Sequence, residues 1–263
     1  MAGHVDVRID QREHGSIAHL TIVHDAKLNT LNRALMRDVV EATEKVMLHA
    51  DLRAVVLTGE GRRAFIGGAD ITAMVEIQEK VGATHFIEQV HQTCRAFRDL
   101  PVPVIARING FALGAGLEVA ASCDLRIAAS SAKFGMPEVL VGIPSVVEAA
   151  LLPGLIGWGR TRRLLLLGET IDAAEALAWG LVEKVVPDAE LDAAVEDWVQ
   201  KLLHAGPQAV RTQKKLIREW EDLPLREAVQ AGISTFASAW RTEEPRRMMQ
   251  GFLDSQAARK RGR

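Results

Sequence analysis

The sequence contains little cysteine and no long apolar run. Only Cys94 and Cys123 occur among its 263 residues, and no CxxC pair is present. Two cysteines cannot complete a zinc site, and a thiol-poor chain is typical of a reducing compartment. No apolar stretch reaches the roughly 18 residues of a membrane span. The N-terminus has no signal-peptide core. We therefore expect a cytoplasmic protein that does not bind a membrane.

Several motifs of common chemistries are also missing. The eight histidines show no HxxxH or HExxH spacing, so we expect no metal site. Gly114 and Gly116 do not complete a GxGxxG dinucleotide fingerprint, because Val119 stands at its last position, and no GxxxxGK[ST] phosphate loop occurs. No GxSxG elbow surrounds Ser145, which argues against a nucleophilic serine.

The charge balance gives no reason to expect a polyanionic partner. The formal net charge is −2, and charged residues make up an ordinary 25%. The chain ends in Ala-Ala-Arg-Lys-Arg-Gly-Arg263, but a short basic tail is usually solvated. We therefore expect no binding to nucleic acid.

Short buried strands alternate with helices over the first two thirds of the chain. Each expected strand is a short apolar run, and several are followed by a glycine and a helix, the first helix covering residues 31–50. The expected strands are 17–23, 53–59, 103–110, 124–129 and 181–186. This order predicts an α/β fold with parallel strand pairing.

The last third of the sequence is predicted to be helical. Asp172 and Glu175 have the spacing of a capping box, which predicts a helix that ends at Gly180. We expect an α/β core over residues 1–195 and a helical region for packing or oligomerisation over residues 196–263. Amphipathic patterns predict its helices, together with the one that leads into it, at 189–204, 207–221, 224–240 and 245–258.

Two glycine-bearing loops follow buried strands and precede helices. The first is Arg63-Ala-Phe-Ile-Gly-Gly-Ala-Asp-Ile71, and the second runs from Asn109 through Gly114-Ala-Gly116. Backbone amides at such turns can hold developing negative charge. For the first loop alone, an ordinary turn with Asp70 opening the helix is the better explanation.

Two glutamates stand in apolar, glycine-rich surroundings where a carboxylate is costly. Glu118 is followed by Val-Ala-Ala, and Glu138 is followed by Val-Leu-Val-Gly-Ile. Burial raises a carboxyl pKa, so two such groups beside one pocket would form an acid/base pair. Taken singly, Glu118 could instead compensate a helix dipole, and Glu138 could pair with an arginine. A third acid, Glu148, either lines the same pocket or pairs within a helix.

Together these segments resemble the crotonase superfamily, the enoyl-CoA hydratase/isomerase family. The resemblance rests on Ala64-Phe-Ile-Gly-Gly-Ala-Asp-Ile71, Asn109-Gly-Phe-Ala-Leu-Gly-Ala-Gly-Leu-Glu118, Cys123-Asp-Leu-Arg126, Phe134-Gly-Met-Pro-Glu138 and the segment 171–182. It implies a crotonase-like spiral of ββα units with a C-terminal helical oligomerisation region, assembled as a homotrimer or homohexamer. It also implies an acyl-CoA substrate, with no cofactor other than the coenzyme A of the substrate itself.

The resemblance further implies roles for particular residues. The thioester oxygen would bind the backbone amides of Ala69 and Ala115. Glu118 and Glu138 would be the catalytic acids, with Glu138 protonating C2 and Glu118 activating water. Substrate-binding positions would be Lys27, Ala69, Asp70, Ile71, Thr72 and Ala115, of which Lys27 and Asp70 through Thr72 would lie near the coenzyme A portion.

The presence of both acids favours a hydratase. The alternatives are an enoyl-CoA isomerase, another crotonase-type hydrolase or lyase, and a non-enzymatic binding protein. The chain departs from the commoner family pattern Ile-Pro-Gly-x-Gly-Gly at Ile143-Pro-Ser-Val-Val-Glu148. This departure puts the preferred acyl chain in doubt, and the reaction class is unaffected.

Overall fold

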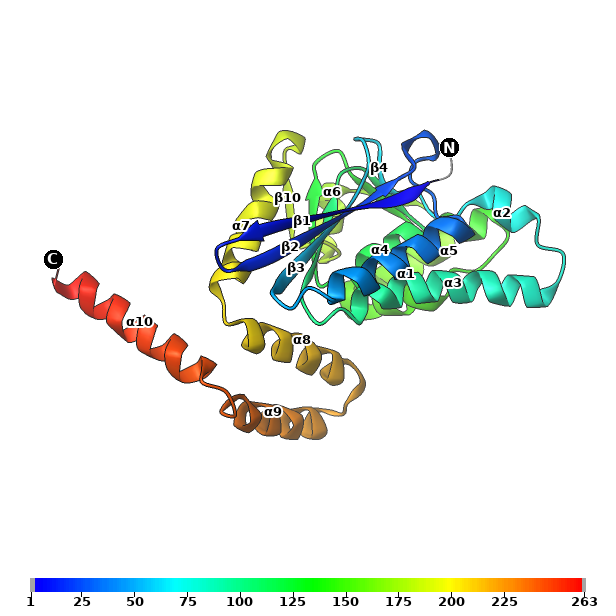
Figure 1. Ribbon diagram of the computed structural model, residues 1–263. Helices are drawn as coiled ribbons and strands as arrows, with labels where there is room; N and C mark the ends of the chain where they lie inside the picture. The colour runs from blue at the N-terminus through cyan, green and yellow to red at the C-terminus, as the bar shows by residue number, and fades with distance from the viewer. Residues whose placement is uncertain (1–2, 262–263) are drawn as a thin grey trace. The chain divides into compact units, whose positions relative to one another are not determined.

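The computed structural model describes residues 3–261. A six-stranded sheet forms the centre of its N-terminal unit, which ends at Val199 (Figure 1). Its outer pair, β1 and β2, is antiparallel, and the remaining neighbours are parallel. The order across the sheet is β1 (His4–Arg12), β2 (Gly15–Val23), β3 (Leu52–Gly59), β5 (Val104–Ile108), β7 (Leu125–Ala129) and β10 (Lys184–Val186). The sequence predicted the other five strands of this sheet but did not predict β1.

A second sheet is built from three-residue strands. Its neighbours are parallel except for β8 and β9, which pair antiparallel. The order is β4 (Ala64–Ile66), β6 (Phe111–Leu113), β8 (Lys133–Gly135) and β9 (Thr170–Asp172). These strands are shorter than the four residues at which a hydrophobic pattern becomes readable, so the sequence did not predict them.

The two sheets are linked by a repeated ββα unit. Each unit places one strand in the six-stranded sheet, the next in the four-stranded sheet, and then forms a helix. The units are β3–β4 with α2 (Ile71–Val75) and α3 (Lys80–Arg98), β5–β6 with α4 (Ala115–Ser122), and β7–β8 with α5 (Leu152–Leu167). The α/β spiral expected from the family resemblance is therefore confirmed.

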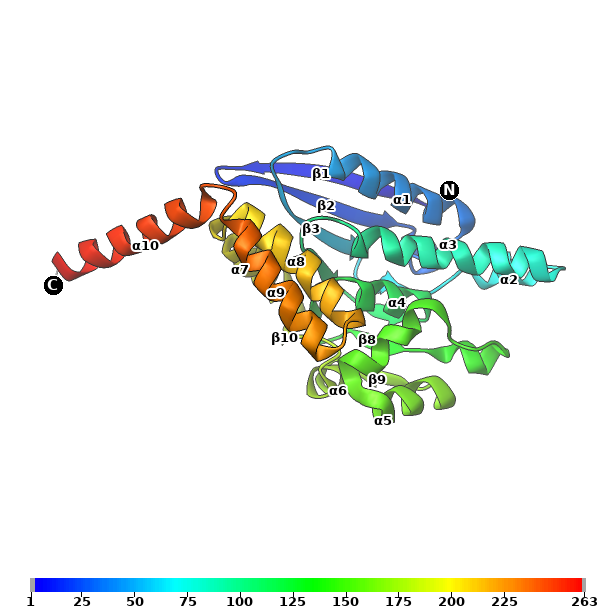
Figure 2. The same ribbon diagram turned by 90° about the horizontal axis from the view of Figure 1, so that it is seen from below.

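Helix α1 (Arg33–Met47) shows how an amphipathic pattern defines an element. The Asn32 side chain accepts a hydrogen bond from the Leu35 N–H at 2.9 Å and so caps the N-terminus. Helices α1 and α3 lie side by side against the sheet (Figures 1 and 2). The buried face of α1 carries Leu35, Met36, Val39, Ala42, Thr43 and Val46.

Helix α6 (Ala173–Trp179) begins and ends where the sequence predicts. Asp172 accepts a hydrogen bond from the Glu175 N–H at 2.8 Å, and Gly180 ends the helix with a φ of +82°. The reciprocal half of the capping box is replaced by an ion pair, because the Glu175 carboxylate lies 2.7 Å from Arg163 Nη1.

The chain divides into two units after Val199, within helix α7 (Leu191–His204). The second unit contains α8 (Pro207–Asp222), α9 (Leu225–Ala239) and α10 (Glu244–Arg261). Trp220 Nε1 on α8 donates to the Ala228 carbonyl on α9 at 2.9 Å. The unit exposes large apolar side chains on α9 and α10, namely Leu225, Val229, Ile233, Phe236, Phe252 and Leu253.

Within residues 3–261, no helix combines the length and the apolar composition that a membrane span requires. The same residues contain no cluster of three or more side chains suited to a metal ion.

Candidate active site

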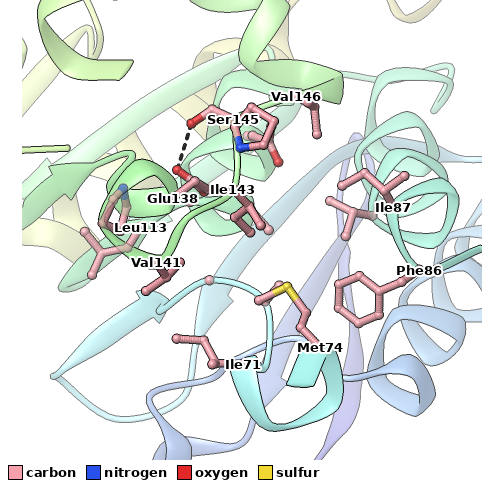
Figure 3. A pocket seen from close by; sticks show the side chains of 18 of the residues that line it. Ile71, Met74, Phe86, Ile87, Leu113, Glu138, Val141, Ile143, Ser145 and Val146 are labelled. Atoms are coloured by element: carbon pink, nitrogen blue, oxygen red, sulfur yellow. Dashed lines mark hydrogen bonds between the residues drawn. The ribbon is translucent and has the colours of Figure 1, made fainter. Parts of the chain in front are cut away.

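A cavity of about 380 Å³ opens beside the N-terminus of α4. One side is apolar and is formed by side chains of α2 and α3, such as Met74, Phe86 and Ile87 (Figure 3). The lining also includes Glu118 and Glu138, the two acids singled out in the sequence. Both predicted acids therefore share one cavity.

Glu118 lies in the first turn of α4, a helix in which every side chain is buried. It is only 4% exposed, and its Oε1 accepts a hydrogen bond from the Ala149 N–H at 3.1 Å. Burial raises the pKa of Glu118 to about 8; the Ala149 amide opposes this rise, and the charges of Glu138 and Glu148 add to it.

Glu138 comes from the short 3-10 helix η2 (Pro137–Val141). Its Oε2 accepts a hydrogen bond from the Ser145 hydroxyl at 2.8 Å (Figure 3). Burial raises the pKa of Glu138, and hydrogen bonds from its own backbone amide and from Ser145 partly offset the rise. Because burial raises the pKa of both acids and the Glu138 charge raises that of Glu118 further, the pair holds a proton more readily than two free carboxyls would.

Gly114 brings Glu138 close to the start of α4. Its φ is +51°, and a Cβ built there would lie 2.4 Å from Glu138 Oε1. Any larger residue would both strain the backbone and displace the carboxylate. Glycine at 114 therefore lets Glu138 lie against the helix N-terminus.

The Ala69 and Ala115 amides belong to two segments that line the same cavity. Ala115 is the first residue of α4, and Ala69 follows the left-handed Gly68, whose φ is +115°. Within residues 3–261, neither N–H donates a hydrogen bond to a protein acceptor. Gly116 lets the two segments approach closely. A Cβ at this position would lie only 2.0 Å from the Ile66 carbonyl oxygen, so a larger residue would push them apart. Among the described residues, two backbone donors without a protein acceptor thus belong to residues that line the cavity together with the two acids.

The remaining predicted site residues lie at its edge or outside it. Ile71 lines the cavity, whereas Lys27, Asp70 and Thr72 are not part of its lining. Asp70 caps α2 by accepting from the Thr72 N–H at 3.0 Å, and its carboxylate lies 3.2 Å from Lys27 Nζ. Burial opposes ionisation of Asp70, but the hydrogen bonds from Lys27 and Thr72 outweigh it and lower the pKa of Asp70.

Glu148 does not line the cavity and pairs with a histidine. It is 7% exposed and sits in the 3-10 helix η3 (Val147–Leu151). Its Oε1 lies 2.7 Å from Nδ1 of His91 on α3. Cys94, one helical turn further along α3, is fully buried, and burial raises the pKa of its thiol well above the ordinary value.

Sequence reasoning missed three residues that hold the acids. Ser145 was considered only as a nucleophile, although a polar residue in an apolar loop seven positions after Glu138 is a signal for a hydrogen-bond partner. The Ala149 N–H and His91 left no signal in the sequence, because their partners lie 31 and 57 residues away.

Comparison with known proteins shows the family. The enoyl-CoA hydratase/isomerase family profile matches residues 12–260. The short-chain-enoyl-CoA hydratase of Clostridium acetobutylicum is 35% identical, over 91% of this chain and 92% of the relative. The crotonyl-CoA hydratase of Syntrophomonas wolfei is also 35% identical, over 92% and 93%.

A solved structure supports the same family assignment. The enoyl-CoA hydratase of Bacillus anthracis superposes with a TM-score of 0.88 at 31% identity, covering 95% of this chain and 96% of the other. The resemblance noted in the sequence motifs is therefore confirmed, and the chain belongs to the enoyl-CoA hydratase/isomerase family.

Proposed function

We propose that this chain is an enoyl-CoA hydratase, a hydro-lyase that adds water across the 2,3 double bond of a 2-enoyl-CoA thioester. One observation carries the proposal: Glu118 and Glu138 share a cavity with the two unpaired amides of Ala69 and Ala115. The activities named for the relatives from C. acetobutylicum and S. wolfei support the same reaction.

The two amides would form the oxyanion hole. The thioester oxygen accepts hydrogen bonds from the N–H groups of Ala69 and Ala115, which polarises the conjugated double bond. Negative charge develops on that oxygen when water attacks C3. Each donor of this kind typically lowers the barrier by about 3–4 kcal/mol.

The two acids would manage the protons. In the reacting complex the single proton of the pair is on Glu138, so ionised Glu118 accepts a proton from the attacking water and Glu138 delivers its proton to C2. The pair therefore holds one proton both before and after the reaction. The raised pKa values of the two acids are consistent with a pair that keeps one proton. Dehydration uses the same steps in reverse.

The cavity suggests where the parts of the substrate lie. Its apolar side, with Met74, Phe86 and Ile87, suits the acyl chain. The coenzyme A portion is proposed to lie near Lys27, Asp70, Ile71 and Thr72, where the half-exposed Lys27 offers a positive charge. The proposal needs no cofactor beyond the coenzyme A of the substrate.

We further propose that the chain assembles as a homo-oligomer and is located in the cytoplasm. The apolar side chains exposed on α9 and α10 support a homotrimer or homohexamer built through the helical region. Light scattering coupled to size-exclusion chromatography tests this, and a monomer at micromolar concentration contradicts it. Neither Cys94 nor Cys123 forms a disulfide, which supports a reducing compartment such as the cytoplasm.

The decisive experiment follows crotonyl-CoA hydration in three variants. Glu118→Gln and Glu138→Gln are expected to lower kcat by about 10²–10⁴-fold. Glu41→Gln, which removes an exposed carboxylate from α1, serves as the matched control and is expected to keep full activity. Product mass separates the alternatives, because hydration adds one water and isomerisation adds nothing. Unchanged turnover in folded Glu138→Gln would falsify the proposal.

A further inference from the structure

A third carboxyl, that of Glu148, is buried one residue before Ala149, whose N–H binds Glu118. The Glu148 side chain is 8% exposed, and Oε2 is buried without a hydrogen-bond partner among the residues that the structure describes. The other carboxylate oxygen, Oε1, forms a hydrogen bond with His91 Nδ1 at 2.7 Å. A buried carboxylate held by a single partner is costly, so its presence calls for a physical explanation.

The turn that carries Glu148 also holds Glu118. The next residue, Ala149, donates its N–H to Glu118 Oε1 at 3.1 Å. The preceding residue, Val147, has a φ of +39°, which is unusual for a β-branched residue and costs about 1–3 kcal/mol. Contacts on both sides of the turn, to His91 on α3 and to Glu118 on α4, keep it in this conformation.

The charge of Glu148 acts on Glu118. Burial is the main cause of the raised pKa of Glu118, and the charges of Glu138 and Glu148 raise it further. The titratable groups around Glu148 are His91 and Cys94 on α3 and Glu118 on α4. Helix α5, which also packs on η3, carries its charged groups at exposed positions, namely Arg160, Arg162 and Arg163.

We propose that Glu148, held by His91, is a positioning residue that acts through Glu118: its buried carboxylate stands on the turn whose Ala149 N–H binds Glu118, and there it acts on the proton that Glu118 and Glu138 share. The consequence for catalysis rests on the hydratase function proposed above. With the charge in place, the Glu118–Glu138 pair retains its one shared proton into the alkaline range. Without it, the pair loses that proton at lower pH.

The sign of the effect separates this role from a merely structural one. Removing the Glu148 charge makes Glu118 easier to ionise and lowers its midpoint. Disrupting the turn instead removes the Ala149 N–H, which stabilises ionised Glu118, so disruption raises the midpoint. A loss of folding stability alone leaves the Glu118 midpoint unchanged.

The test measures the titration of Glu118 directly. Difference infrared spectroscopy of the full chain follows the protonated carboxyl band between pH 5 and 10, and the band is assigned by its loss in Glu118→Gln. Glu148→Gln is expected to lower the midpoint by about 1 pH unit. Glu88→Gln, an exposed charge removal three residues before His91 on α3, is the control and should leave it unchanged.

His91→Leu tests the same link from a half-exposed position, and it also serves if Glu148→Gln does not fold. Leucine has no donor, so the buried Glu148 carboxylate loses its partner and its charge is disfavoured, and the Glu118 midpoint should fall as well. In the Glu148→Gln background, His91→Leu should change that midpoint by less than about 0.3 unit. An unchanged or raised midpoint in either single variant overturns the proposal.

Activity provides a second readout. In Glu148→Gln, the pH profile of kcat/KM for crotonyl-CoA is expected to move with the infrared midpoint while KM stays constant. If the wild-type chain does not hydrate crotonyl-CoA, the proposed function fails, and the infrared midpoint still decides the role of Glu148. A profile that stays in place while the midpoint falls overturns the link to catalysis.

Discussion

Replacing Glu118 by glutamine is expected to make folding stability less sensitive to alkaline pH. In the folded chain the pKa of Glu118 is about 8, against an ordinary value of 4.5. Above pH 4.5 the unfolded chain releases this proton while the folded chain retains it. A raised carboxyl pKa therefore removes stability as the pH rises from 4.5 to 8, and the loss is constant above that range.

The size of the effect follows from the shift. Each pKa unit corresponds to about 1.4 kcal/mol, so Glu118 costs the folded state roughly 3–4 kcal/mol between pH 5 and pH 8. The side chain is only 4% exposed, so solvent screening is small. Glutamine still accepts the Ala149 N–H, but its amide lacks an acceptor, a pH-independent cost of about 1–3 kcal/mol. The change with pH isolates the ionisation.

Urea unfolding at fixed protein concentration measures this difference. Between pH 5 and pH 8, the wild-type chain should lose roughly 3–4 kcal/mol more unfolding free energy than Glu118→Gln. Glu41→Gln, with its exposed side chain, should follow the wild type. If the Glu118→Gln and wild-type curves fall in parallel, Glu118 does not hold a proton in the folded state.

Three other substitutions test the surroundings of the acids. Gly114→Ala places a Cβ 2.4 Å from Glu138 Oε1, so kcat should fall more than about 100-fold, whereas Gly154→Ala, with open space around it, should be silent in the same assay. Ser145→Ala removes the hydroxyl that stabilises ionised Glu138, so the pH profile of kcat should shift upward and kcat should fall about 5–10-fold; a downward shift contradicts the assigned bond. Val146→Asp puts a charge at an apolar position of the cavity lining, so KM for crotonyl-CoA should rise more than about tenfold, and an unchanged KM would place the acyl chain elsewhere.

The sequence predicted those features that depend on local patterns. Glu118 could be recognised as buried because its neighbours within one helical turn are apolar all round. The helix ending at Gly180 followed from a glycine that adopts a positive φ. Strand β1 was predictable in principle, since Val5, Val7 and Ile9 alternate with polar residues, but as an exposed edge strand it buries little of that pattern.

Features that depend on distant contacts could not be predicted. Strand β4 has three residues and exists because β6, far along the chain, pairs with it. The capping-box prediction failed in its second half because Arg163 competes for the Glu175 carboxylate. The His91–Glu148 contact joins two helices across 57 positions, and a motif search has no access to such pairs.

The alkylation rate of the buried Cys94 thiol can report motions around this site. Because the thiol is fully buried and its pKa is raised, alkylating reagents can reach it only when α3 separates from its neighbours. The rate at which the Cys94 peptide gains mass would therefore report how often that helix opens. The same measurement with an acyl-CoA bound would show how strongly a ligand closes it.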